Sequence, residues 1–110
     1  KTITSSGQSF NVLNFNGSGG GWTLQDNLAV TGDLTLTAGT LDVSGSIFAI
    51  SVAGTWNNAG GAFTAQAGTV TLNGASQSIL GSTGFFNLTK SVASAATLTF
   101  SAGIMMWPSC

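Results

Sequence analysis

The sequence predicts an all-β chain that folds as a β-solenoid (β-helix), and three observations lead to that prediction. Short runs of alternating apolar and polar residues recur between glycines, which is typical of strands that bury one face. Gly, Thr, Ser and Asn are abundant, and these residues disfavour helices. The alternating runs also return at a constant spacing along the chain, which indicates a stack of similar units.

The expected strands follow one another from the first residues to the last. Residues 1–4 form an alternating run at the start, and the apolar residues 104–107 form a final strand. Between them the expected strands cover residues 12–15, 28–30, 34–36, 41–43, 70–72 and 98–100. Glycines near the ends of these runs are expected to provide the turns.

The spacing predicts a repeat of about 28–29 residues. Leu13, Leu41, Val70 and Leu98 follow one another at nearly equal steps of this length, and other apolar positions keep the same phase. We therefore expect about four coils in which equivalent residues stack in ladders about 4.8 Å apart. The residues expected in these core ladders are Leu13, Leu41, Val70, Leu98, Phe15, Val43, Leu72, Phe100, Trp22, Ile50 and Ile79.

A β-sandwich is the alternative architecture, because sandwiches also show short strands separated by frequent turns. A sandwich gives no reason for a repeat to hold its phase over nearly four units. On either architecture, residues 1–110 form a single domain, which is either complete in itself or an excerpt of a longer repetitive chain.

The composition argues against several classes of function. Charged residues make up 5% of the chain, and neither His nor Arg is present. We therefore expect no enzyme, no cofactor and no metal site, because the usual acid–base groups and anion clamps are missing. Two lysines are too few for a nucleic-acid partner, and no apolar run is long enough to span a membrane. Stacked ladders favour neutral side chains, since like charges one rung apart repel.

Four local features have both a structural and a functional interpretation. Asp26 and Asp33 either close turns or form a pair of carboxylates at one corner. Residues 17–21, which are mostly glycine, are expected to form a loop or tight corner rather than a phosphate site. The tryptophans are expected in the core, with a sugar-binding platform as the alternative, and Thr-x-Thr pairs leave ice binding as a weaker possibility.

The ends of the chain are the expected assembly interface. Neither end shows a polar cap, and an uncapped solenoid exposes unpaired backbone groups and an apolar cross-section. The residues assigned to this interface are Ile3, Ile104, Met105, Met106, Trp107 and Cys110. Cys110 is either a simple tail thiol or the source of an intermolecular disulfide.

Segments such as residues 68–74, 77–79 and 85–89 resemble repetitive bacterial cell-surface proteins, in the style of filamentous haemagglutinins and autotransporter passenger β-helices. The resemblance implies an extracellular or cell-surface location and a structural or adhesive role. Our leading hypothesis is a fibre subunit that joins copies of itself head-to-tail. A surface adhesin or carbohydrate-binding module with a glycan partner is the alternative.

Overall fold

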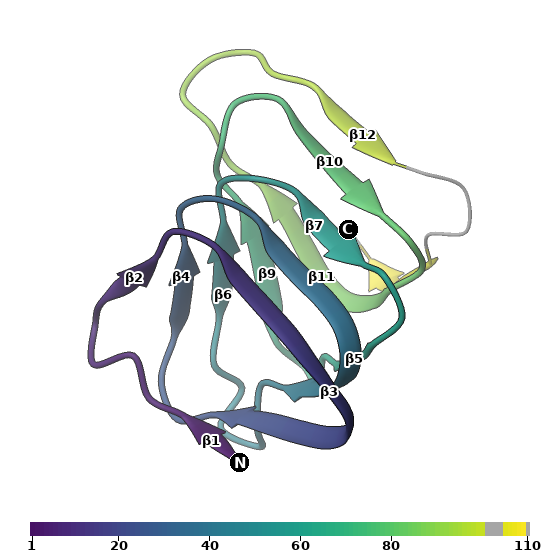
Figure 1. Ribbon diagram of the computed structural model, residues 1–110. Helices are drawn as coiled ribbons and strands as arrows, with labels where there is room; N and C mark the ends of the chain where they lie inside the picture. Colours follow the sequence, from purple (N-terminus) through teal and green to yellow (C-terminus); the bar gives the residue numbers. More distant parts are fainter. Residues whose placement is uncertain (101–104, 110) are drawn as a thin grey trace.

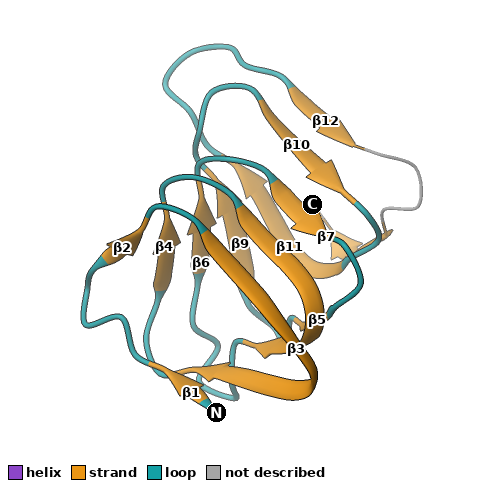
Figure 2. Ribbon diagram, in the orientation of Figure 1, coloured by secondary structure: helices purple, strands orange, loops and turns teal. Residues whose placement is uncertain are grey.

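The computed structural model describes residues 1–100 and the backbone course of residues 105–109. In this part of the chain every regular element is a strand (Figure 2). The strands are β1 (Thr2–Ile3), β2 (Ser9–Phe10), β3 (Leu13–Leu24), β4 (Leu28–Val30), β5 (Leu34–Asp42), β6 (Ile50–Val52), β7 (Trp56–Asn58), β8 (Ala62–Thr64), β9 (Thr69–Leu72), β10 (Gln77–Leu80), β11 (Gly84–Lys90), β12 (Leu98–Phe100) and β13 (Met105–Ser109).

The chain winds into a β-solenoid of about five turns with three sides (Figure 1). The first side contains the beginnings of β3 and β5, followed by β7, β10 and β12. The second side contains β1, the later parts of β3 and β5, and β8. The third side is a separate sheet in the order β13-β11-β9-β6-β4-β2. All the strand pairs are parallel, so the predicted solenoid is confirmed and the antiparallel sandwich is not the architecture.

The predicted repeat length and the predicted number of coils are wrong, because one turn of the solenoid, here called a rung, is shorter than expected. Leu13 pairs with Leu34 and not with Leu41. Successive rungs advance by about 18–23 residues. The longest step on the first side joins Trp56 to Ile79, and the shortest step on the third side joins Val70 to Leu88.

The apparent period arises because all three sides show the same alternation of inward and outward residues. Leu13 lies on the first side, Leu41 on the second and Val70 on the third, and Leu98 returns to the first. The spacing seen in the sequence therefore covers one rung plus one side. Each step lands on another inward position, but the four residues do not stack on one another.

The core consists of columns of inward side chains from successive rungs. One column on the first side contains Leu13, Leu34, Trp56, Ile79 and Phe100. Of the expected core residues, Leu41, Val70, Phe15, Val43, Leu72, Ile50 and Ile79 are buried. Leu13, Leu98 and Trp22 are partly buried against this core. Phe100 is 42% exposed because it is the last described member of its column.

Small residues allow the rungs to stack closely at the corner between the third and first sides. A Cβ atom added to Gly32 would lie 2.3 Å from the carbonyl oxygen of Asn11. At Gly74 the added atom would lie 1.9 Å from the carbonyl oxygen of Ala53. These approaches are too short for any side chain, so glycine is required where one corner lies directly on the previous one.

Candidate functional site

The first described rung leaves three strand edges open at the amino-terminal end of the stack. Strands β1 and β2 and the beginning of β3 each pair with a following strand on one side only. Ile3, Phe10 and Leu13 are partly buried there against the core. Their uncovered surface faces along the stack, where no further described rung lies. This end therefore combines unpaired backbone groups with apolar side chains.

The opposite end is formed by β12, β13 and the end of β11. Phe100 is the outermost described member of the first-side column. In β13 the backbone places Met105 beside Gly84 and Met106 beside Phe85, and Trp107 belongs to the same strand. Ile104 and Cys110, which were assigned to the interface from the sequence, lie outside the described residues. Ile3 and β13 thus lie at opposite ends of the described stack (Figure 1).

A lysine ends one of the third-side columns. Phe10, Val30, Val52 and Leu72 occupy successive rungs of that column, and Lys90 takes the next inward position. Its Nζ donates hydrogen bonds to the carbonyl oxygens of Gly74 and Ala75, each 2.6 Å away, and to Oε1 of Gln77. All three acceptors belong to the preceding rung. The ammonium group is therefore directed back into the stack.

Inward polar side chains occur next to the corner between the third and first sides, and this corner changes in length along the stack. This corner spans residues 11–12, 31–33, 53–55, 73–76 and 91–97 in successive rungs, so it lengthens toward the end of the stack. In the shorter corners, backbone N–H groups donate hydrogen bonds to carbonyl oxygens of the preceding rung. For example, Gly54 N–H donates to the carbonyl oxygen of Gly32, 2.8 Å away. The longer corners keep part of this pattern, as Asn73 N–H donates to the carbonyl oxygen of Val52 at 3.1 Å and Ser91 N–H to that of Leu72 at 3.0 Å.

In the longer corners, side-chain donors supply further hydrogen bonds to carbonyl oxygens of the preceding rung. Nε2 of the buried Gln77 donates to the carbonyl oxygens of Val52 and Gly54, at 2.8 and 2.7 Å. Lys90 performs the same task one rung further along. Sequence reasoning missed both residues, because the wrong repeat length concealed that they occupy inward positions.

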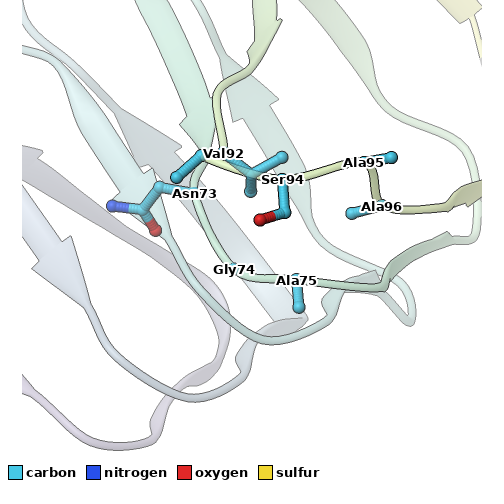
Figure 3. Close-up of a pocket in the computed structure, with 8 residues that line it drawn as sticks. Asn73, Gly74, Ala75, Val92, Ser94, Ala95 and Ala96 are labelled. Carbon is cyan, nitrogen blue, oxygen red and sulfur yellow. The ribbon is translucent and has the colours of Figure 1, made fainter.

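A cavity of about 280 Å³ lies where the corner at residues 73–76 separates from the loop at residues 91–97. Figure 3 shows the hydroxyl of Ser94 between the two segments, whereas the side chain of Asn73 points away. The carbonyls of Gly74 and Ala75 on its wall are already bound by Lys90. The cavity therefore offers few free polar groups to a ligand.

The aspartates serve turns and contacts between rungs rather than a shared site. Asp26 and Asp33 lie at opposite ends of β4, so they do not form the paired carboxylates considered from the sequence. Asp26 accepts hydrogen bonds from the backbone N–H groups of Ser5 and Ser6. These bonds, led by that of Ser5, lower the pKa of Asp26 from its ordinary 3.8. Asp33 accepts a bond from Thr55 N–H, 2.8 Å away.

No group of three or more Asp, Glu, His or Cys residues gathers within residues 1–100 and 105–109 in a way suited to a metal ion. Every buried side-chain nitrogen or oxygen in the part of the chain described has a hydrogen-bond partner. The same part contains no helix long and apolar enough to cross a membrane.

Two of the tryptophans pack against other aromatic side chains of the solenoid. Trp56 is fully buried and contacts the rings of Phe63 and Phe85, at centroid distances of 5.0 and 5.1 Å. Trp22 packs against Phe15 and beneath the corner at residues 17–21, where an added Cβ on Gly17 would lie 2.9 Å from the indole. Trp56 therefore offers no open face as a sugar-binding platform would, and Trp22 is partly buried against the core. The glycine-rich residues form a bulged corner of β3.

In the observed register, the outward threonines have other neighbours than the predicted repeat gave them. Thr69 and Thr71 lie beside Asn87 and Thr89 on the third side. On the preceding rung Thr71 lies beside Ser51, and the column continues to Ala29 and Ser9. The Thr-x-Thr pattern therefore occupies a single rung of this face rather than a continuous ladder.

The comparisons with known proteins add no relationship: no family model matches the chain, and no curated protein and no solved structure is similar to it. The fold defines the class, a parallel three-sided β-solenoid with about five turns.

Proposed function

We propose that this chain is a structural segment of an extracellular fibre, in which copies join head-to-tail through the ends of the solenoid. The observation that carries the proposal is the state of the two end rungs. Each leaves strand edges with a partner on one side only among the described residues, together with inward apolar side chains such as Leu13 and Phe100.

Joining the ends gives two kinds of stabilisation. A further parallel rung adds main-chain hydrogen bonds along every side, as in β-augmentation. It also removes the partly exposed apolar side chains of the end rungs from water, which contributes roughly 25 cal/mol for each Å² of apolar surface buried. Few charges oppose this contact, because the whole chain contains two lysines and three aspartates.

The direction of the strands determines the kind of assembly. Since all strands run parallel, the two ends of the stack present different edges and different residues. A contact between unlike ends is heterologous, and it generates a filament unless the rotation closes a ring. The extracellular location rests on the resemblance to secreted repetitive proteins and is part of the same proposal.

The particle size of the purified chain tests this function. Dynamic light scattering across a dilution series, with negative-stain electron microscopy of the same samples, should show filaments that shorten as the concentration falls. A chain that remains monomeric at every concentration would overturn the proposal.

A further inference from the structure

We propose that a groove between two rungs binds an extended, cationic peptide segment of a partner protein. The groove, here called the β8 groove, consists of the open edge of β8 and an adjoining cavity lined by Ala65, Gln66, Gly84, Phe85 and Phe86. The peptide adds one strand to the second side and places a large apolar side chain in the cavity. This inference goes beyond the proposed fibre function and does not depend on it, because the groove lies between rungs rather than at an end of the described stack.

In the described part of the chain, the second side of the solenoid ends at β8. Leu80 pairs with Asn57 on the first side, and Asn87 pairs with Thr69 on the third. The eleven residues between Asn57 and Thr69 include β8, whereas only six residues lie between Leu80 and Asn87 in the next rung. Figure 1 shows the chain turning from β10 directly into β11. Among the described strands β8 is therefore paired with β5 alone.

The open edge of β8 presents the backbone groups of Phe63. Val43 N–H donates to the carbonyl oxygen of Thr64, 3.3 Å away, so Thr64 directs its backbone groups toward β5. Neighbouring residues of a strand direct these groups to opposite sides, so the N–H and C=O of Phe63 face away from β5. The flanking residues Ala62 and Thr64 are exposed. An edge of this kind is the template to which an extended peptide adds through main-chain hydrogen bonds.

The cavity beside this edge has a volume of about 320 Å³ and lies between the corner that follows β8 and the first residues of β11. Phe85 is buried on its wall, with its ring centroid 6.1 Å from that of Phe63. Phe86 is half-buried and Gly84 is exposed, so the cavity opens outward. Its mainly apolar, aromatic wall suits one leucine or phenylalanine side chain of an added strand.

The charge beside the groove favours a cationic peptide. Asp42 lies next to Thr64 on the outer face of the second side. Its carboxylate accepts hydrogen bonds from Ser44 N–H and from Nε2 of Gln66, at 2.8 and 3.1 Å, and it forms no ion pair within the described residues. A lysine on the outer face of an added strand has a long, flexible stem that can lean over Thr64 toward this carboxylate. The groove therefore fits a segment in which lysines alternate with an apolar residue.

A labelled peptide tests the site. The probe has leucine at its centre, lysine on each side of it and threonine at both ends, with fluorescein on the amino terminus and an amidated carboxyl terminus. Fluorescence anisotropy should show saturable binding to the unsubstituted chain. Gly84→Leu places a side chain in the cavity without a clash, because an added Cβ there meets nothing within 4 Å, and it should weaken binding at least about tenfold. The matched control Ala75→Leu adds the same side chain to the exposed wall of the other cavity and should leave binding unchanged.

N-methylated peptides test the backbone bonds without changing the protein. If the peptide adds antiparallel to β8, the N–H donated to the carbonyl oxygen of Phe63 belongs to the central leucine. If it adds parallel, that N–H belongs to the lysine that follows the leucine. N-methylation at one of these two positions should therefore weaken binding at least about tenfold, and the other position serves as its control.

A pair of neutral substitutions tests the charge. Asp42→Asn should weaken binding of the lysine-containing peptide about two- to fivefold, the range of an exposed ion pair. Asp33→Asn, at the corner between the third and first sides, removes the same charge away from the groove and should have no effect. Equal effects of the two substitutions would overturn the assignment of a cationic partner.

The remaining outcomes decide the groove itself. A peptide that fails to bind, or that binds Gly84→Leu as tightly as the unsubstituted chain, would overturn the inference. Equal affinities for the unmethylated peptide and both N-methylated forms would also overturn it. Self-association that Gly84→Leu abolishes would place a second copy of the chain in the groove and overturn the assignment to a separate partner. None of the peptide-binding results bears on the fibre proposal, which is decided by particle size.

Discussion

The indole N–H of Trp56 donates a hydrogen bond to the hydroxyl of Thr83, 3.1 Å away inside the solenoid. Trp56 is fully buried and Thr83 is 3% exposed, so water does not replace this bond if it is lost. The substitution Thr83→Val should therefore lower the free energy of unfolding by about 1–3 kcal/mol, the cost of an unsatisfied buried donor. Urea unfolding at low protein concentration measures the change.

The control for Thr83 is Thr89→Val on the exposed outward face, which should change stability by less than about 0.5 kcal/mol. Equal effects of the two substitutions would show that the buried bond contributes nothing specific.

The close stacking of corners makes Gly74 sensitive to substitution. A Cβ atom there would lie 1.9 Å from the backbone carbonyl of Ala53, so Gly74→Ala forces the two rungs apart. We expect a loss of about 1–3 kcal/mol, typical of overpacking, measured by thermal or urea unfolding. Gly45→Ala is the matched control, because an added Cβ there meets nothing within 4 Å. A loss at Gly45 as large as at Gly74 would refute this explanation.

Much of the fold was predictable from the sequence, and the part that was not has a definite cause. Alternation within strands depends only on neighbouring residues, so the runs around Leu28 and Val70 predicted strands β4 and β9 correctly. The repeat length depends on which strands lie side by side. Since all three sides have similar lengths and the same alternation, the sequence pattern fits a step of one rung plus one side as well as a step of one rung.

The candidate site was less accessible to sequence reasoning for the same reason. Ile3 lies in the edge strand β1, whereas the inward positions of Phe10 and Lys90 were missed because their column appears only in the true register. Once the true rung length is known, the sequence itself shows a lysine at an inward position of an otherwise apolar column. That lysine is the signal that identifies Lys90.

Lys90 should contribute to stability through its three acceptors. Lys90→Met keeps the apolar stem but leaves the carbonyl oxygens of Gly74 and Ala75 without the bonds they now accept. We expect a loss of about 1–3 kcal/mol in the free energy of unfolding. Lys1→Met removes the same charge at an exposed position and should have little effect. Indistinguishable unfolding curves for the two variants would contradict the assigned role.

Asp26 should make the fold sensitive to acid. Its pKa is lowered in the folded chain, chiefly by the Ser5 backbone N–H, so its ionised form stabilises the fold above its unfolded pKa. That contribution is lost as the pH falls below about 4 and through the folded pKa. Asp26→Asn should therefore flatten the acid limb of a plot of unfolding free energy against pH. An acid limb as steep as that of the unsubstituted chain would contradict this.

Phe10→Lys should weaken self-association, because it removes a partly buried apolar side chain from the amino-terminal end of the stack and adds a charge there. Burying a phenylalanine contributes about 1.5–3 kcal/mol, so the concentration needed for assembly should rise at least about tenfold. The control Val12→Lys changes a neighbouring residue that is 63% exposed and points outward. Sedimentation velocity compares the two variants, and equal shifts would argue against a specific Phe10 contact.

Cryo-electron microscopy of assembled chains tests the central claim most directly. A head-to-tail stack of about five rungs per copy predicts an axial rise of about 24 Å per subunit, with the strand spacing of about 4.8 Å continuing without a break across each junction. Filaments whose strands run along the fibre axis, or whose ladder is interrupted between subunits, would contradict the account.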